Sequence, residues 1–508
     1  MDILKVHLSK SKNTVGLGRN LREVDVRMSF VQDSALSVDW CDVARVTIDV
    51  LPDVALLEIF DYYLDDERQI ELWHTLVHVC RKWRIIVFGS PRRLNLRLRC
   101  IPRTPVREML DIWPPLPIVL TVLNTKISVI DNVLAALEHS DRICELFFHN
   151  NPRWQLEEVL AAMQRPFQAL TRLHLHFQPG REVAPVVPAS FLGGSTPRLQ
   201  RLSLHCIPFP ALPNLLLSAT HLVDLGLWRI PHSGYFSPEA MVTGLSVLTS
   251  LQNLVIDFKS PRSRPDRKSR RPPLHTRTLL PVLTKLQFHG VVEYFEDLVA
   301  RIDAPLLDRL HITFYNQDIF DTSQSTQFIS RTPKFKGHDE ARVVFSYWGG
   351  SVTLSRTQTS DGRLHLTMLG SPSDRQLSSL AQVCSSSFPQ APFPAVEHLY
   401  ILDNRYLRPY WPDEIETDQW LRLLHPFSAV KGLHISRELT PRIAPALRVL
   451  VGERATEVLP ALQTLFLEET LQSGPVQETI GQFVAARQLA DHPVAVCRWE
   501  RKGTRFED

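Results

Sequence analysis

A short hydrophobic pattern, L-x-x-L-x-L, recurs along most of the chain and limits the folds that it can adopt. Its middle positions lie 23 to 34 residues apart, except for one interval of 89 residues between Leu310 and Leu399. Alternating apolar residues over so few positions predict a short β-strand with one face in a core. The copies are Ile143/Leu146/Phe148, Leu170/Leu173/Leu175, Leu199/Leu202/Leu204, Leu222/Leu225/Leu227, Leu251/Leu254/Ile256, Leu283/Leu286/Phe288, Leu307/Leu310/Ile312, Val396/Leu399/Ile401, Val430/Leu433/Ile435 and Leu462/Leu465/Leu467.

Helix-like segments separate many of these strands, among them Leu156–Met163 and Glu239–Leu248. A strand plus a helix every 23–34 residues is the leucine-rich-repeat period, which stacks into a curved α/β solenoid. The 89-residue interval would hold about three further units. We therefore expect a continuous solenoid over residues 94–495. It should be irregular, because the position that follows the strand is asparagine only at Asn151 and Asn404.

The composition is that of a soluble globular protein, with 44% hydrophobic and 22% charged residues and a net charge of +3. This balance gives no reason to expect a membrane or a specific nucleic acid as partner. Seven scattered cysteines without a CxxC pair argue against a disulfide framework or a structural zinc site. No signal-peptide pattern opens the chain, and Leu116–Leu123 is too short to span a bilayer. We expect a cytoplasmic or nuclear protein, or one found in both.

Catalytic motifs are missing from the sequence. His74 and His78 sit four residues apart but lack the glutamate of a zinc-protease motif, and neither a phosphate-binding loop nor a GxSxG elbow occurs. Gly16 and Gly18 lack the third glycine of a dinucleotide fingerprint, since position 21 is Leu21. The prediction is a protein that is not an enzyme and binds no cofactor or metal. A Cys–His nucleophile stays open, because its partners need not be neighbours in sequence.

The residues between the repeated leucines point away from the core, onto the inner face of the predicted solenoid. Seven of the 19 histidines occupy such positions. Rings on such a face can form a peptide-recognition surface, although any single one of them also fits an ordinary half-exposed strand position. The predicted substrate face consists of His174, His205, Trp228, His289, His311, Tyr400, His434 and Phe466, with His176 and His398 in equivalent positions.

A basic segment, residues 259–277, interrupts the repeats with eight basic residues, one acid and four prolines. Such a composition cannot bury enough apolar area to order itself. It is either a solvated loop between repeats or a functional segment, namely a nuclear localisation signal or a patch that binds an anionic partner. Residues 1–45 show no clean periodicity and are expected to form a loosely ordered leader.

A different pattern lies ahead of the repeats, in Leu51–Trp83 (LPDVALLEIFDYYLDDERQIELWHTLVHVCRKW). After Leu51-Pro52, apolar residues at helical spacing predict a first short helix that ends near Ile59-Phe60. A second helix is predicted to end at Val79-Cys80-Arg81-Lys82-Trp83. Both helices are too short to be stable alone, so their apolar faces must be buried against something.

This segment resembles an F-box, and with its flank and the repeats the chain resembles the F-box proteins expanded in mushroom-forming fungi. The resemblance implies an F-box over residues 46–93 that binds the Skp-type adaptor of a cullin–RING (SCF) ubiquitin ligase. The repeats would then capture a protein substrate, and other subunits would transfer ubiquitin. The implied adaptor-binding residues are Leu51, Pro52, Leu56, Leu57, Ile59, Phe60, Val79, Cys80 and Trp83.

Two departures from the family pattern bear on the affinity for the adaptor. Val54 and Ala55 stand where relatives have an acid and then a branched aliphatic residue, and the inter-helix segment Asp65–Glu71 is longer and more charged than in short F-boxes. We expect weakened adaptor binding. The alternative function is a non-ligase interaction or scaffold protein whose degenerate box only caps the first repeat.

Overall fold

The computed structural model describes most of the 508 residues. The described ranges are 50–64, 72–89, 96–99, 106–112, 117–122, 130–150, 152–178, 183–265, 276–315, 322–357, 359–370, 373–387, 393–411, 417–468 and 474–501. The chain divides into two compact units, Met1–Ala55 and Leu56–Asp508. The predicted leader, the segment Asp65–Glu71 and the central part of the basic segment (266–275) lie outside the described residues.

Three helices form within the predicted box: α1 (Asp53–Leu64), α2 (Leu72–Val79) and α3 (Arg81–Gly89). The second predicted helix is therefore two helices, and the prediction of a single one was wrong. The break is at Cys80, whose Sγ accepts a hydrogen bond from the Trp83 backbone N–H at 3.4 Å and whose carbonyl accepts one from Arg84 at 3.1 Å. Cys80 thus satisfies first-turn donors of a new helix, as an N-cap residue does.

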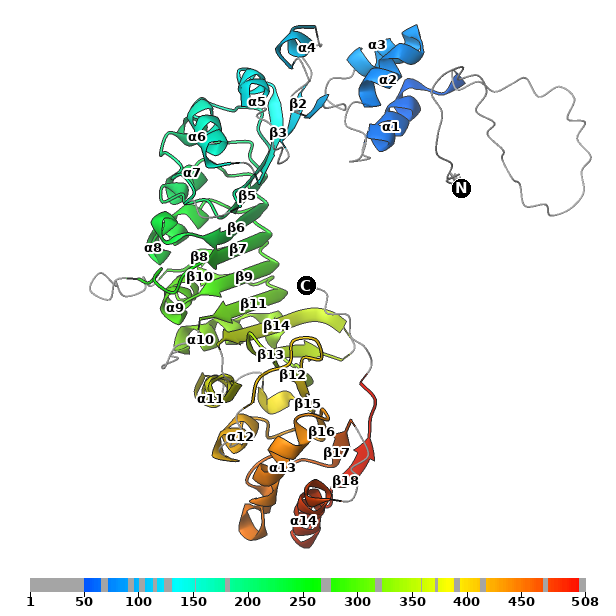
Figure 1. Cartoon of the computed structure of the whole chain (residues 1–508), viewed down its shortest axis with the longest axis vertical. Coiled ribbons are helices and arrows are strands. Elements are labelled where there is room, and N and C mark those ends of the chain that lie inside the picture. The colour runs from blue at the N-terminus through cyan, green and yellow to red at the C-terminus, as the bar shows by residue number, and fades with distance from the viewer. Residues whose placement is uncertain are drawn as a thin grey trace, which may run out of the picture. The chain divides into compact units, whose positions relative to one another are not determined.

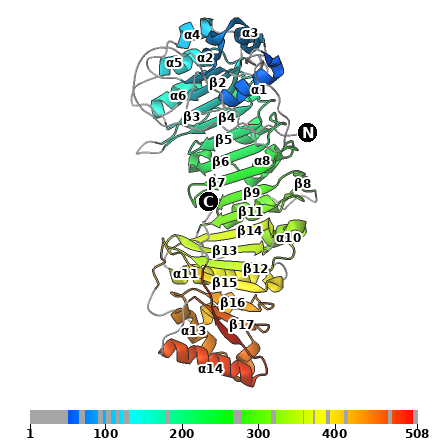
Figure 2. The same cartoon turned by 90° about the vertical axis from the view of Figure 1, so that its right-hand side faces the viewer.

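Sixteen of the described strands form one sheet, in which neighbours are mostly parallel (Figures 1 and 2). In spatial order they are β1 (Leu96–Arg99), β2 (Ile118–Val122), β3 (Ile143–His149), β4 (Arg172–His176), β5 (Arg201–His205), β6 (Asp224–Ile230), β7 (Asn253–Phe258), β9 (Lys285–Gly290), β11 (Arg309–Phe314), β14 (Thr359–Leu369), β13 (Gly349–Arg356), β12 (Glu340–Phe345), β15 (His398–Asp403), β16 (Gly432–Ile435), β17 (Thr464–Leu467) and β18 (Ala495–Arg498). A separate parallel pair joins β8 (Thr278–Leu279) to β10 (Ile302–Asp303).

Helices from successive repeats lie along one face of this sheet, and many of them pack against the helix of the next repeat (Figure 1). They are α4 (Val106–Ile112), α5 (Ile130–Leu137), α6 (Arg153–Ala162), α7 (Leu212–Leu216), α8 (Pro238–Leu245), α9 (Val292–Val299), α10 (Ser323–Arg331), α11 (Ser373–Gln382), α12 (Thr417–Leu424), α13 (Thr440–Arg448) and α14 (Pro475–Leu489). The strand-plus-helix repeat read from the leucine spacing is thus present as a long, mixed α/β stack.

The repeated leucines form the core between the sheet and the helices. Leu146, Leu173, Leu202 and Leu225 pair in register across β3 to β6, and each is at most 1% exposed. Burying one such side chain contributes roughly 1.5–3 kcal/mol. Because strand side chains alternate between faces, fixing these leucines on the helix side also fixes the intervening residues on the opposite side.

Adjacent repeats are joined by the same backbone hydrogen bonds at the start of eight of the sixteen described sheet strands. A single carbonyl accepts two N–H groups from the next repeat, at 2.8–3.1 Å. The carbonyls belong to Thr171, Gln200, Val223, Gln252, Thr284, Asp339, Glu397 and Lys431. Since a carbonyl oxygen has two lone pairs, it can accept both bonds. These paired bonds fix the register between units of unequal length.

The sequence predicts about three strand–helix units in the 89-residue interval, and this prediction was wrong. The interval holds an antiparallel meander of β12, β13 and β14, in which β13 runs against both neighbours. The links between these strands, residues 346–348 and 357–358, are far shorter than the dozen or so residues that a parallel crossover needs. The sheet is still continuous, because β14 pairs in parallel with β11 and β12 in parallel with β15.

Candidate binding face

Side chains on the sheet face opposite the helices form two rows that follow the strand register. The first row holds Phe147, His174, Ser203, Gly226, Val255, Gln287, His311, His365, Thr353, Arg342, Tyr400, His434 and Phe466. The second row lies two residues from the first on each strand and includes His149, His176, His205, Trp228, Asp257, His289, Thr313, Thr367 and Ser351. All eight predicted substrate-face residues lie in these rows, which bring them together in three clusters.

The first cluster is a strip of rings across β3 to β6. The His149 and His174 rings are stacked with centroids 4.5 Å apart, and His205 lies 5.1 Å from both His174 and His176. The Trp228 indole is stacked on His205 at 5.5 Å and 17°. A Cβ at Gly226 would come within 2.8 Å of the Trp228 Nε1, so glycine leaves the room that this ring occupies.

The imidazoles of this strip are uncharged at neutral pH. Burial and, to a smaller extent, the neighbouring histidines lower the pKa of both His174 and His205 to about 4. Burial also lowers the pKa of His149 and of His176. A neutral imidazole offers one hydrogen-bond donor and one acceptor. The strip therefore presents flat, polarisable rings with both kinds of polar group, and no net charge.

The second cluster lies on the central strands. The His289 Nδ1 is 2.8 Å from a carboxylate oxygen of Asp257 on β7. The rings of His311 and His365 meet edge to face at 4.4 Å, and burial lowers their pKa values to about 4 and about 3. Hydroxyls of Thr353 and Thr367 lie 2.7 and 2.9 Å from the two ring nitrogens of His365.

The third cluster surrounds His434 on β16. Its ring is stacked between Tyr400 at 4.1 Å and Phe466 at 4.2 Å, and burial lowers its pKa to about 4. Trp499, which follows β18, meets the ring edge to face at 5.3 Å. The Arg342 guanidinium lies over Tyr400, 5.2 Å from the ring centroid, in a cation–π contact.

Sequence reasoning missed several members of these clusters. His149 belongs to the weakest copy of the leucine pattern, and His365 and Arg342 belong to the meander, where no repeat was recognised. Trp499 lies beyond the predicted end of the solenoid at residue 495. The alternating strand signal in Leu364–Met368 could have identified His365. No local signal identifies Trp499, because its contacts come from residues far away in sequence.

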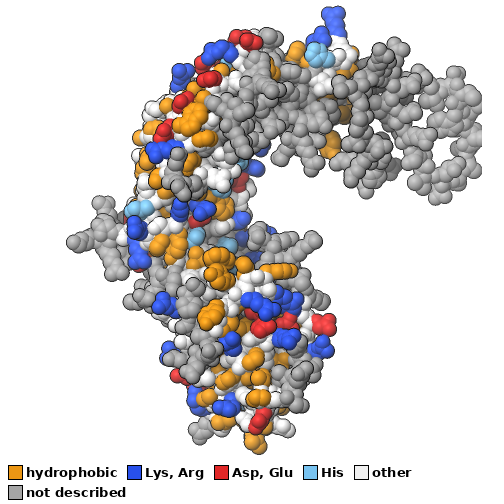
Figure 3. Space-filling view, viewed as in Figure 1, with side chains coloured by type: hydrophobic (Ala, Val, Ile, Leu, Met, Phe, Trp, Pro, Cys, Tyr) orange, Lys and Arg blue, Asp and Glu red, His pale blue; other side chains and the backbone are white. Residues whose placement is uncertain are grey.

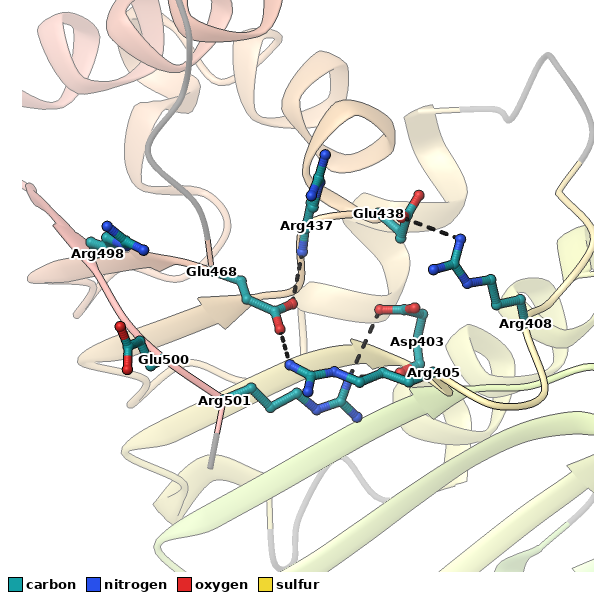
Figure 4. Close-up of a pocket in the computed structure, with 9 residues that line it drawn as sticks. All are labelled: Asp403, Arg405, Arg408, Arg437, Glu438, Glu468, Arg498, Glu500 and Arg501. Carbon is teal, nitrogen blue, oxygen red and sulfur yellow. Dashed lines mark hydrogen bonds and ion pairs between the residues drawn. The ribbon is translucent and has the colours of Figure 1, made fainter. Parts of the chain in front are cut away.

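A polar pocket of about 430 Å³ lies at the carboxyl ends of β15 to β17 (Figure 4). Five arginines and four carboxylates line it: Arg405, Arg408, Arg437, Arg498, Arg501, Asp403, Glu438, Glu468 and Glu500. Arg405 forms an ion pair with Glu468, Arg408 with Glu438 at 3.6 Å, and Arg501 with Asp403 at 3.9 Å. Most charges in the pocket are therefore matched by an opposite charge.

The surface as a whole shows the same balance. In Figure 3, acidic and basic side chains are interspersed over the visible face rather than gathered in areas of one sign. Among the described residues, no group of three or more His, Cys, Asp or Glu side chains is placed to hold a metal ion. No described helix combines the length and the apolar character that crossing a membrane requires.

The structure separates the residues predicted to bind an adaptor by their exposure. Leu56, Leu57 and Phe60 are buried, and the Phe60 ring packs against Trp83 with centroids 4.8 Å apart. Leu51, Cys80 and Trp83 are half-buried. Pro52, Ile59 and Val79 are exposed. The predicted set therefore contains side chains that hold the helices together as well as side chains that are open to a partner.

Comparisons with known proteins identify no family for this chain. No family profile matches it, and no curated protein does. Among solved structures, the leucine-rich repeat-containing protein LegL7 from Legionella pneumophila matches with 12% sequence identity and a TM-score of 0.27, covering 77% of this chain and 97% of that chain. The repeat architecture described above rests on this chain's own strands, register and buried leucines.

Proposed function

We propose that this chain is an F-box-type substrate receptor. In this proposal α1 to α3 bind the Skp-type adaptor of an SCF ubiquitin ligase, and the two rows on the sheet face capture a protein substrate. The chain itself catalyses nothing, since other subunits, linked to the adaptor through cullin, transfer ubiquitin. It acts in the cytoplasm, the nucleus or both.

The division of the box residues into a buried and an exposed set carries this proposal. Phe60 and its neighbours hold the short helices together, which leaves Ile59 44% and Val79 56% exposed. On α3, Ile85 and Phe88 are also exposed, one helical turn apart. So many exposed apolar side chains on three short helices favour a surface that a protein partner covers.

The sheet face supports the second half of the proposal. Interface cores are enriched in aromatic residues and arginine and poor in lysine, aspartate and glutamate. The His149–Trp228 strip is made of rings, and the His434 cluster combines rings with Arg342. Long repeat stacks also offer extended binding surfaces without needing a catalytic pocket. Together these features favour a role in holding a protein.

Co-purification with a recombinant Skp-type adaptor tests the proposal. The full-length chain should retain the adaptor, and the double variant Ile59→Asp/Val79→Asp should lose at least ten-fold in retention because it places charge on the exposed apolar surface. Trp154→Asp is the matched control, since Trp154 is 45% exposed on α6, outside the box. If the wild-type chain does not retain the adaptor, the scaffold alternative replaces the ligase role.

A further inference from the structure

The C-terminal segment Trp499–Arg501 crosses back over the sheet face and occupies part of it. After β18 the Trp499 backbone N–H donates to the Leu467 carbonyl at 3.0 Å, and its indole Nε1 donates to the Ile435 carbonyl at 3.4 Å. Two residues later an Arg501 Nη1 donates to the Asp403 carbonyl at 2.8 Å. The segment thus reaches from β17 across β16 to β15, onto residues 64 and 98 positions away in the chain.

Trp499 and Arg501, two alternate residues of this segment, pack against the face. The Trp499 ring lies 5.3 Å from His434 and 6.0 Å from Tyr400, and the Arg501 side chain is only 8% exposed. Arg498 and Glu500 are exposed. An extended peptide that binds a protein surface places every second side chain in a pocket in this way.

The Arg501 position is selective for a cation. The Asp403 side chain is 6% exposed, and Arg501 is its ion-pair partner among the described residues, at 3.9 Å. Removing one partner from a buried ion pair leaves an uncompensated charge, which is strongly unfavourable. Figure 4 shows Arg501 reaching beneath Asp403 and Arg405. A ligand that displaces the segment must therefore bring its own guanidinium or ammonium group.

We infer that the face of β15 to β17 is a preformed peptide-binding site, and that the chain's own Trp499–Arg501 occupies it. Its ligand class is an extended segment with an aromatic residue followed two positions later by arginine. Tyr400 and His434 contact the aromatic ring, and Asp403 binds the arginine. This inference rests on the proposed role of the sheet face in substrate capture and names the kind of segment that this part of the face selects. A substrate has to compete with the C-terminal segment.

A peptide-binding assay on the full chain tests this inference. The probe is a fluorescein-labelled, amidated tetrapeptide of residues 498–501, Arg-Trp-Glu-Arg, and the control peptide carries alanine at the Trp and second Arg positions. In fluorescence anisotropy, the double variant Trp499→Ala/Arg501→Ala should bind the probe at least ten times more tightly than the wild-type chain, and the control peptide should not bind. Val496→Ala, an exposed change on β18, should behave as the wild type does.

Two outcomes overturn the inference: the double variant binds the probe no better than the wild type, or it binds both peptides alike. Circular dichroism establishes whether each variant is folded. If the double variant is unfolded, Arg501→Ala carries the same test, because without the Arg501–Asp403 ion pair the segment competes less well for the face. Probe binding must then rise above that of the wild type. Adaptor retention, measured on the same variants, should stay unchanged, so a failure of the ligase proposal is distinguishable from a failure of this site.

Discussion

The imidazole of His434 lies almost parallel to the Phe466 ring, with the planes 3° and the centroids 4.2 Å apart. On its other side it is stacked on Tyr400 at 15°. The side chain is 9% exposed, and neither ring nitrogen has a hydrogen-bond partner in the described structure. His434 therefore acts as a flat ring between two others rather than as a charged or hydrogen-bonding group.

Substituting His434 should distinguish a role in ring stacking from a role in hydrogen bonding. We expect His434→Phe to keep the stacking and to remove two buried polar atoms, so that stability changes by less than about 1 kcal/mol or rises. His434→Ala leaves a cavity between Tyr400 and Phe466 and should cost about 2–4 kcal/mol. Urea unfolding of both variants measures the difference. Equal destabilisation by Phe and Ala would show that the imidazole makes a polar contact that phenylalanine cannot replace.

The histidines of the face should make folding stability fall in mild acid. Burial lowers the folded-state pKa to about 4 for His174, His205, His311 and His434, and to about 3 for His365. In the unfolded chain these groups titrate near pH ~6.5. Between these values the unfolded state binds more protons, so stability falls as the pH drops from about 6.5 towards 4 and is unaffected by these groups above about 7.

Thermal unfolding between pH 7.5 and 4.5 checks this pH dependence. The double variant His311→Gln/His365→Gln removes two of the titrating rings and keeps polar atoms near Thr353 and Thr367. Its melting temperature should therefore vary less with pH than that of the wild type. If both proteins lose stability equally between pH 6.5 and 5, the histidines are not the groups responsible.

The repeats could be predicted because their signal is local. A period of two along each strand fixes which face is buried, so Leu173 and His174 are assigned to opposite faces from the sequence alone. The meander could not be recognised in this way, because β12, β13 and β14 carry the same alternation as parallel strands. Only the short links at 346–348 and 357–358 distinguish it. The contact between Trp499 and His434 depends on tertiary packing and leaves no pattern in the sequence.

The box was predicted as a pattern of residue types, and the pattern does not say which side of each helix is covered. Leu57 and Ile59 both belong to it, yet Leu57 is 8% and Ile59 44% exposed. Cys80 was read as a position inside one helix, whereas its sulfur and carbonyl begin a new one. Exposure depends on how three short helices pack together, which helix periodicity alone does not determine.

This difference in exposure predicts that two neighbouring substitutions in α1 abolish adaptor binding for different reasons. Phe60→Ala removes a fully buried ring that packs on Trp83 and should cost about 3–5 kcal/mol, so the box loses its structure and its adaptor binding together. Ile59→Asp changes an exposed position and should leave thermal unfolding within about 0.5 kcal/mol while adaptor binding is lost. Calorimetry combined with adaptor pull-down reads both effects. Retained adaptor binding in Ile59→Asp would remove this side chain from the proposed interface.

Arg487 on α14 should be among the most sensitive single positions in the last repeat. Its side chain is fully buried and donates to the carbonyls of Ala455 at 2.8 Å and of Leu459, Pro460 and Leu462 at 3.3 Å. Burial lowers the pKa of this guanidinium, and no carboxylate is paired with it among the described ion pairs. The carbonyls of residues 455–462 therefore take the place of a counter-ion and connect α14 to the segment that leads into β17.

Arg487→Met keeps the aliphatic volume but leaves these carbonyls without a donor, and should destabilise the protein by about 2–4 kcal/mol. Arg487→Lys keeps the charge but can reach fewer of the four acceptors, and should fall between methionine and the wild type. Arg454→Met on the nearby surface, where the Arg454 side chain is 50% exposed, is the matched control and should change stability by less than about 0.5 kcal/mol. Urea unfolding measures the order of stability among the wild type and these variants. A lysine variant as stable as the wild type would mean that charge alone is needed at this position, whereas a ranking of wild type above lysine above methionine identifies the guanidinium fork as the group that holds the last repeat on the sheet.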